Sequence, residues 1–455
     1  MSLHYTDFAL YYKHMHETER DTILQAAEAV LKDNDRGLYT IPAHGLYPHQ
    51  WLWDSCFIAL GWRHIDVERA KIEILSLLRG QWRNGMLPHM VFTSGDKYRT
   101  DHNTWRSWVS PFAPDDVVTS GITQPPMLAE AIVKVGEKLP LLERRAWYRQ
   151  VWQPLLDYHQ WLYTDRDPHG EGLTLQIHPW ETGLDNTPPW MAELHEHLLP
   201  WWIRVLQKTH LTRVTGLFRR DIHYVPGEQR FTNVDVLAVY DAQRRLRRKN
   251  YDIDKVLDHT LFAIEDITFN SILIRANEHL LDIAKSIRAD VPPDLLKHID
   301  LTRKTLQELW DPYTEQYYSR NFVTHKLIKV PSIGTLMPLY AGTISKEQAA
   351  KLVKTIENEH IFGPAYPIPS TPLNSAWFDP NRYWQGPTWF NTNWLIADGL
   401  RRYGYKDHAD ALIEGSLELV KANHFNEYFN PLSGAPLGAS NFSWTAAIAI
   451  DWIKD

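Results

Sequence analysis

The chain contains a single cysteine, Cys56, among its 455 residues, so it can form no disulfide within itself. Cys56 lies in an apolar run, where we expect a buried structural thiol. No stretch approaches the roughly 18 uninterrupted apolar residues that a membrane-spanning helix needs. The N-terminus also lacks a basic segment followed by an apolar one, as a secretory signal would have. These absences predict a cytoplasmic protein with no membrane partner.

An excess of basic residues is missing as well. The 55 acidic residues outnumber the 48 Lys and Arg, which gives a formal charge of −7. A chain with this charge balance has no excess of positive charge that would bind a polyanion, so we expect no nucleic-acid partner. The one basic run, at 244–249, ends an expected helix, where cations suit the negative end of the helix dipole. We interpret it as a solvated helix end, with phosphate binding as the alternative.

Several catalytic signatures are absent. The sequence has no phosphate-binding glycine loop, no G-x-S-x-G elbow and no dinucleotide fingerprint. His195 and His197 stand two residues apart, whereas four residues would place two histidines on one helix face. We therefore expect no metal and no cofactor, and the chemistry must come from the side chains themselves.

Helical periodicity is what the sequence does contain: apolar residues recur three and four apart along most of the chain. The expected helices are 21–31, 51–62, 67–78, 124–135, 144–162, 233–247, 255–287, 293–309, 333–340, 346–356, 391–402, 409–421 and 443–453. The stretch 255–287 is long for one helix, and we expect a break at 266–268, where two β-branched residues follow an acid. The best hairpin candidate is 321–328.

About twelve helices without a linker predict an all-α fold, in which six helical hairpins close into an (α/α)6 barrel and bury each other's apolar faces. The length would allow two domains, but one closed ring accounts for it equally well. We expect a single catalytic domain over 1–455. An irregular helical domain is the alternative, because no sequence period marks the repeats. Residues 190–231, rich in tryptophan, are interpreted as an inserted lid.

Two carboxylates stand among aromatic and turn-forming residues: Asp185, between Trp180 and Trp190, and Glu427, before Tyr428. An apolar surrounding favours the protonated form of one acid while the other stays ionised, which is what a glycosidase needs. Glu181 is a rival to Asp185 for the acid. The structural alternatives are an aspartate in an Asx-turn and a solvated glutamate.

The aromatic residues gather in loops, which is where binding sites usually form. The segment Tyr-Pro-His-Gln-Trp-Leu-Trp-Asp at 47–54 sets two indoles beside Asp54, an acid that needs hydrogen-bond partners such as sugar hydroxyls. The segment Tyr-Trp-Gln-Gly-Pro-Thr-Trp at 383–389 has a similar composition, and its Gly-Pro turn allows Trp384 and Trp389 to project toward one cavity. Aromatic core packing is the alternative for both segments.

These two segments, together with Trp-Glu-Thr-Gly-Leu-Asp-Asn-Thr-Pro at 180–188 and Glu-Tyr-Phe-Asn-Pro-Leu-Ser-Gly at 427–434, resemble glycoside hydrolase family 63, in particular its glucosylglycerate and mannosylglycerate hydrolases. The resemblance spans about residue 31 to the end. It implies an (α/α)6 barrel that hydrolyses α-linked sugars with inversion, with Asp185 as general acid and Glu427 as general base. His89 matches a residue on the leaving-group side. The other expected substrate-binding residues are Tyr47, Trp51, Trp53, Asp54, Gln124, Gly183, Arg230, Trp384, Gln385 and Trp389.

Two departures from that family affect the leaving group. Gln385 stands where the family usually has arginine, which removes a positive charge near the sugar. Arg230 begins the nearest match to an Arg-x-Ser-Asp-x-x-Tyr stretch that helps hold the glycerate carboxylate, but Val236 replaces the tyrosine. The segment 190–229 is also longer than in those relatives. A glycerate glycoside is therefore the first candidate substrate, and a neutral α-glucoside remains an alternative.

Two other classes of function stay open at this point. Other (α/α)6 proteins are sugar epimerases or isomerases that use paired histidines, and the chain has 22 histidines. A non-catalytic carbohydrate-binding protein is the second rival, although binding alone would require neither an acid nor a base. In each case the expected partner is a small-molecule carbohydrate. The sequence leaves the oligomeric state open, a homo-oligomer included.

Overall fold

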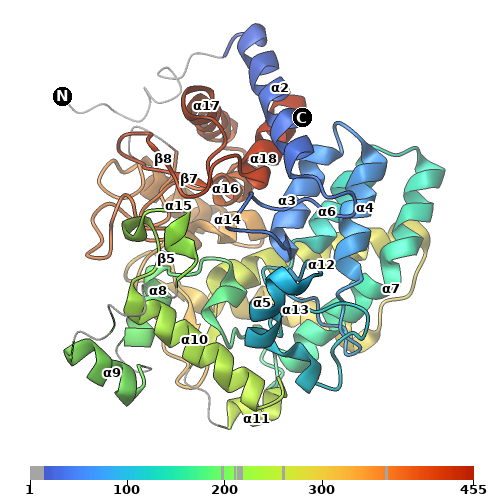
Figure 1. The fold of residues 1–455 in the computed structure, drawn as a ribbon. Coiled ribbons are helices and arrows are strands. Elements are labelled where there is room, and N and C mark those ends of the chain that lie inside the picture. Colours follow the sequence, from blue (N-terminus) through green and yellow to red (C-terminus); the bar gives the residue numbers. More distant parts are fainter. Residues whose placement is uncertain (1–14, 196–198, 210–211, 213–218, 259–261, 364–366) are drawn as a thin grey trace.

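The computed structural model describes residues 15–195, 199–209, 212, 219–258, 262–363 and 367–455. Within these ranges, twelve helices alternate along the chain between an outer and an inner ring, and they can be followed by colour in Figure 1. The outer helices are α2 (Glu17–Asn34), α4 (Val67–Leu78), α7 (Leu141–Asp165), α13 (Pro293–Thr305), α15 (Lys346–Glu357) and α17 (Lys406–Asn423). The inner helices are α3 (Leu52–Trp62), α6 (Leu128–Glu137), α12 (Ile267–Ile287), α14 (Pro338–Ala341), α16 (Phe390–Arg402) and α18 (Ser443–Lys454).

The inner ring is closed. Each inner helix packs against the next, and the last one, α18, packs against the first, α3. Every residue of α3 is buried, as expected of a helix that is apolar on all sides. A side chain at Gly61 would place its Cβ 2.5 Å from the backbone of Ala447, so glycine allows α3 and α18 to approach closely. The all-α (α/α)6 prediction is confirmed.

The helix boundaries agree with the sequence in most places and differ where prolines or caps intervene. The expected helix 124–135 begins only at Leu128, because Pro125 and Pro126 disfavour helical backbone in the residues before them. The expected break in 255–287 is confirmed: α11 (Ile253–Leu257) is followed by the strand β3 (Ile264–Glu265), and α12 then begins. Asp266 caps α12 by accepting a 2.8 Å hydrogen bond from the Phe269 N–H.

The strands are short antiparallel pairs in the loops. β1 (Gln50–Trp51) pairs with β2 (Met90–Val91), β3 with β6 (Arg320–Asn321), β4 (Trp310–Asp311) with β5 (Gln316–Tyr317), and β7 (Tyr428–Phe429) with β8 (Pro436–Leu437). The hairpin expected at 321–328 is present as a turn that returns Leu327 to Arg320. The other pairs were not expected, because two-residue strands leave no alternating pattern to read.

A long insertion separates α7 from α12. It contains α8 (Pro188–Glu193), α9 (Trp201–Lys208), α10 (Asn233–Arg248) and α11, and the last three lie together at the lower left of Figure 1. The basic run ends α10, as predicted, and Arg247 donates to two backbone carbonyls of α5 (Arg99–Trp105). The predicted lid at 190–231 includes residues 196–198, 210, 211 and 213–218, which lie outside the described residues. Across the described ranges, no helix combines the length and apolarity needed to span a membrane.

Candidate active site

The two carboxylates singled out in the sequence meet at one cluster of aromatic and cationic side chains. Asp185 follows the 3₁₀ helix Pro179–Thr182, and Glu427 comes directly before β7. Tyr383 donates from its hydroxyl to Asp185 Oδ2 at 3.1 Å, and Tyr47 donates to Glu427 Oε1 at 2.7 Å. The Arg230 guanidinium lies 4.2 Å from the ring centre of Tyr383 and 5.8 Å from that of Tyr47. Residues far apart in the sequence are thereby assembled around one arginine.

Glu427 is held by donors on both of its oxygens. Oε1 accepts from Tyr47 and from Arg230 Nη1 at 3.3 Å, and Oε2 accepts from the Ala439 N–H at 3.0 Å. The side chain is 2% exposed. An ionised carboxylate is a pure acceptor, so this set of donors suits the charged form that a general base requires.

Asp185 has a different environment. The pKa of Asp185 is raised to about 7, mainly by burial; the hydrogen bond from Tyr383 and the charge of Arg230 oppose this rise, and the charge of Glu427 adds to it. A carboxyl with such a pKa carries a proton at neutral pH in a substantial fraction of molecules. It can therefore donate that proton to a leaving oxygen.

Asp54 completes a group of three acids. Burial raises its pKa well above the usual value, and the charges of Glu427 and Asp185 add to the shift. It lies in the first turn of α3, next to Trp53, whose backbone N–H reaches Gln124 Oε1 at 3.4 Å. No other side chain of the described residues is hydrogen-bonded to the Asp54 carboxyl. Contact of Asp54 with sugar hydroxyls stays a prediction.

The aromatic rings of the segment 383–389 stack in layers. Trp384 and Trp389 stack at 3.8 Å with their planes 5° apart, and Tyr428 covers the other face of Trp389 at 4.4 Å. Trp389 therefore lies behind Trp384 and presents no free ring face to a cavity. Gln385 donates from Nε2 to the backbone carbonyl of Asn186 at 3.1 Å, which ties this segment to the loop of Asp185.

Gly183 lies two residues before Asp185 and packs against Trp53. It ends the 3₁₀ helix before Asp185 with φ of +73°, a left-handed conformation that favours glycine. A Cβ at this position would lie 2.7 Å from the indole of Trp53. The glycine at this position is thus explained by backbone conformation and by close packing against Trp53.

A second group of aromatic side chains surrounds His89. The His89 ring packs against Trp51 at 5.0 Å, Trp105 at 5.2 Å and Trp180 at 6.1 Å, and its Nδ1 is 2.6 Å from Ser120 Oγ. Burial lowers the pKa of His89 well below its usual value, so the ring is neutral. In the described part of the chain, His89 Nε2 and the indole nitrogens of Trp51 and Trp180 are buried without a hydrogen-bond partner.

Tyr383 was not singled out in the sequence, although it begins the segment 383–389. It contacts Asp185 and Arg230 at once, and its φ of +40° is unusual for an aromatic residue. Backbone strain of this kind cannot be read from one sequence. The rival acid, Glu181, is fully occupied: it accepts from Arg166 at 2.8 Å and from the backbone N–H groups of Thr123 and Ile177. We therefore assign Glu181 a structural role.

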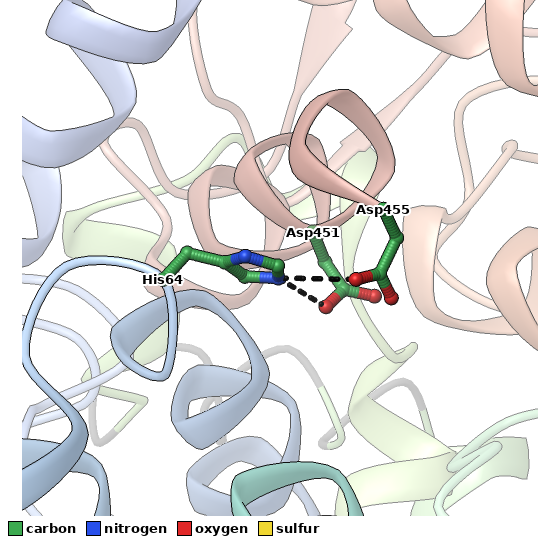
Figure 2. Close-up of side chains that lie close together, drawn as sticks. All are labelled: His64, Asp451 and Asp455. Carbon is green, nitrogen blue, oxygen red and sulfur yellow. Dashed lines mark hydrogen bonds and ion pairs between the residues drawn. The ribbon is translucent and has the colours of Figure 1, made fainter. Parts of the chain in front are cut away.

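The described residues contain one group with metal-ligand spacing, shown in Figure 2: His64, Asp451 and Asp455. His64 Nε2 lies 3.1 Å from Asp451 and 3.7 Å from Asp455. The guanidinium of Arg63 also contacts both carboxylates, so a cation already neutralises them. We interpret the group as an ion-pair cluster that joins the end of α3 to α18. Of the two neighbouring histidines noted in the sequence, His195 and His197, the first has its Nε2 2.9 Å from Asp235 Oδ1.

Comparison with known proteins identifies relatives along most of the chain. A family model described as the mannosylglycerate hydrolase MGH1-like glycoside hydrolase domain matches residues 47–445. The chain is 38% identical to a mannosylglycerate hydrolase from Thermus thermophilus, with 94% of this chain and 100% of the relative aligned. It is 31% identical to a glucosylglycerate hydrolase from Mycolicibacterium hassiacum, over 94% and 96% of the two chains. The crystal structure of a family 63 mannosylglycerate hydrolase from Thermus thermophilus, in complex with Tris and D-glycerate, superposes with a TM-score of 0.84 at 37% identity and covers 94% of this chain and 99% of that one.

Proposed function

The chain belongs to the mannosylglycerate hydrolase MGH1-like glycoside hydrolase family, and on this premise we propose that it hydrolyses α-glycosides of glycerate, with Asp185 as general acid and Glu427 as general base. Membership of this family favours hydrolysis over the epimerase and the non-catalytic binding protein that the sequence left open. The observation that carries the assignment of roles is the contrast between the two carboxyls: one has a raised pKa, and the other is surrounded by donors.

The reaction follows from that contrast. Asp185 gives its proton to the glycosidic oxygen as the bond from that oxygen to the anomeric carbon breaks. Glu427 takes a proton from a water molecule whose oxygen attacks the anomeric carbon from the opposite face. The released sugar then has the inverted configuration, Asp185 is left ionised and Glu427 protonated. We place the sugar against Trp53, Asp54, Gln124 and Trp384.

Arg230 is our candidate for the carboxylate of the leaving group. Its guanidinium is buried, and its Nε has no hydrogen-bond partner among the described residues, although Asp221 Oδ2 lies 3.8 Å away. A buried N–H group without a partner is costly, and a glycerate carboxylate would supply an acceptor. Arg230 would then bind the leaving group with one N–H and hold Glu427 with another.

A neutral α-glucoside is the second candidate. The side chain of Gln385 favours this candidate, because it carries no charge and its amide donates to the Asn186 carbonyl. Arg230 is also already paired with one anion, Glu427, at 3.3 Å. Both features reduce the positive charge that is free for an anionic leaving group.

A substrate panel tests the proposal. Mannosylglycerate, glucosylglycerate, trehalose and maltose are incubated with the enzyme, free sugar is measured, and Asp185→Asn serves as the control for contaminating activity. We expect turnover of a glycerate glycoside, with the β-anomer as the first product seen by NMR. Preference for trehalose or maltose would transfer the function to neutral disaccharides. Release of the α-anomer would contradict the inverting roles of the two carboxyls.

A further inference from the structure

A cavity of about 410 Å³ adjoins the cluster of Arg230 and Glu427. Trp51 belongs to its lining and packs against Tyr47 at 5.8 Å, and Asp221 belongs to its lining and lies 3.8 Å from Arg230 Nε. The cavity therefore lies next to the residues that we assign to the leaving-group side of the site. Cavities that bury ligands of drug size have volumes of roughly 300–1,000 Å³. Glycerate, with only three carbons, is far smaller than such a ligand.

We propose that this cavity is a second leaving-group subsite, which takes a polyhydroxylated ring attached to the leaving group that Asp185 protonates. The substrates in this class are α-glycosides whose leaving group carries a further sugar unit. The inference rests on the proposed hydrolysis of glycerate glycosides and extends it outward from the first subsite.

The walls of the cavity have the chemistry of a sugar subsite. Trp51, Trp105 and Trp180 supply three indoles, whose faces suit the apolar C–H faces of a pyranose. The indole nitrogens of Trp51 and Trp180, and the adjacent His89 Nε2, are buried without a protein partner within the described ranges. Sugar hydroxyls would supply the missing acceptors. A purely apolar ring would leave the two indole N–H groups unsatisfied.

One face of α10 closes the cavity. Val236, Val239, Tyr240 and Gln243 recur three and four apart, so they project from the same side of the helix, and all four belong to the lining. Val236 is the residue of this face that lies nearest to Arg230 in the sequence. A larger residue at position 236 would occupy the space that we assign to the ring.

The rim of the cavity is polar and reaches solvent. Arg220 and Asp101 lie 3.6 Å apart there, with side chains 41% and 36% exposed. Arg220 also donates to the Gly45 carbonyl at 2.9 Å. Arg219, Arg220 and Asp221 come from the segment 190–231 that the sequence marked as an insertion. We assign this described part of the insertion to the mouth of the second subsite.

The test compares two substrates of the wild-type enzyme: a simple glycerate glycoside, and the same glycoside with one further hexose on the free glycerate hydroxyl. We expect kcat/KM to be about tenfold higher for the extended substrate, since one or two aromatic contacts are gained. Val236→Phe should abolish this preference. The matched control, Leu237→Phe, changes the next residue of α10, which packs in a different cluster, and should preserve it.

Calorimetry with the free hexosyl-glycerate and with D-glycerate gives a second measurement on the wild-type protein, independent of turnover and of how the variants fold. We expect the hexosyl-glycerate to bind about tenfold more tightly. Equal affinity for the two, or equal kcat/KM for the two substrates, would overturn the second subsite while leaving hydrolysis of glycerate glycosides intact. A preference for an aryl leaving group over the hexose-bearing one would overturn the assignment of a polyhydroxylated ring. If neither glycoside is hydrolysed, the proposed function fails, and the calorimetric comparison still decides the subsite.

Discussion

Replacing Tyr383 with phenylalanine should move the alkaline limb of the pH–rate profile upward. The Tyr383 hydroxyl donates to Asp185 Oδ2 at 3.1 Å, and this hydrogen bond stabilises the ionised carboxylate. It therefore opposes the effect of burial, which is the main cause of the raised Asp185 pKa of about 7. Removing the hydroxyl leaves the effect of burial and raises the pKa further, so the general acid stays protonated to a higher pH. The phenyl ring still packs on Arg230.

The size of the shift follows from the strength of the bond. A hydrogen bond to a charged group contributes roughly 1.5–3 kcal/mol. One pKa unit corresponds to about 1.36 kcal/mol, so the pKa of Asp185 should rise by roughly 1–2 units. The assay is kcat/KM measured from about pH 5 to about pH 10, because this parameter reports the acid and base of the free enzyme.

Tyr317→Phe is the matched control, since Tyr317, on β5, is also a buried tyrosine, and its hydroxyl donates to Gln307 at 3.1 Å. Its alkaline limb should coincide with that of the wild type. An alkaline limb in Tyr383→Phe that stays in place, or that moves to lower pH, would refute the reasoning. In that case either Asp185 is not the general acid, or Tyr383 does not act on its pKa.

Four further results are expected. Asp185→Asn and Glu427→Gln should each lower kcat by at least about 10²-fold with the fold retained by circular dichroism, and turnover close to wild type would remove that residue from the mechanism. The folded-state pKa of Asp185 is raised, so the stability tied to its protonated form is complete below the pKa of the unfolded state and is lost as the pH rises through about 7. Asp185→Asn should therefore gain in free energy of unfolding relative to the wild type between about pH 4 and about pH 8. Arg230→Ala should raise KM for a glycerate glycoside much more than for a neutral α-glucoside, and equal effects would mean a structural role. Gly183→Ala should cost about 1–3 kcal/mol more in urea unfolding than Gly37→Ala, since both have positive φ but only the first would meet an indole, and equal costs would contradict the packing argument.

Elements that depend on local chemistry could be predicted from the sequence. Helical periodicity is a property of neighbouring residues, so it predicted the alternating helices of the ring and the break at Asp266, where a capping acid precedes β-branched residues. The short motifs around Asp185 and Glu427 were also visible, because each carboxylate is framed by aromatic residues within a few positions. The resemblance to glycoside hydrolases added the roles of these two acids as a prediction.

The contacts between side chains of different elements depend on the tertiary structure. Tyr47 is 380 positions from Glu427, and Tyr383 is 198 positions from Asp185, so no local pattern links them. These four side chains lie around Arg230 because the helices close into a ring, which brings loops from both ends of the chain to one place. The same holds for the cavity beside Trp51, whose walls come from α10 and from loops near the N-terminus. Spacing along the chain fixes which face of a helix is apolar, whereas the distance between two distant side chains depends on how all the helices pack together.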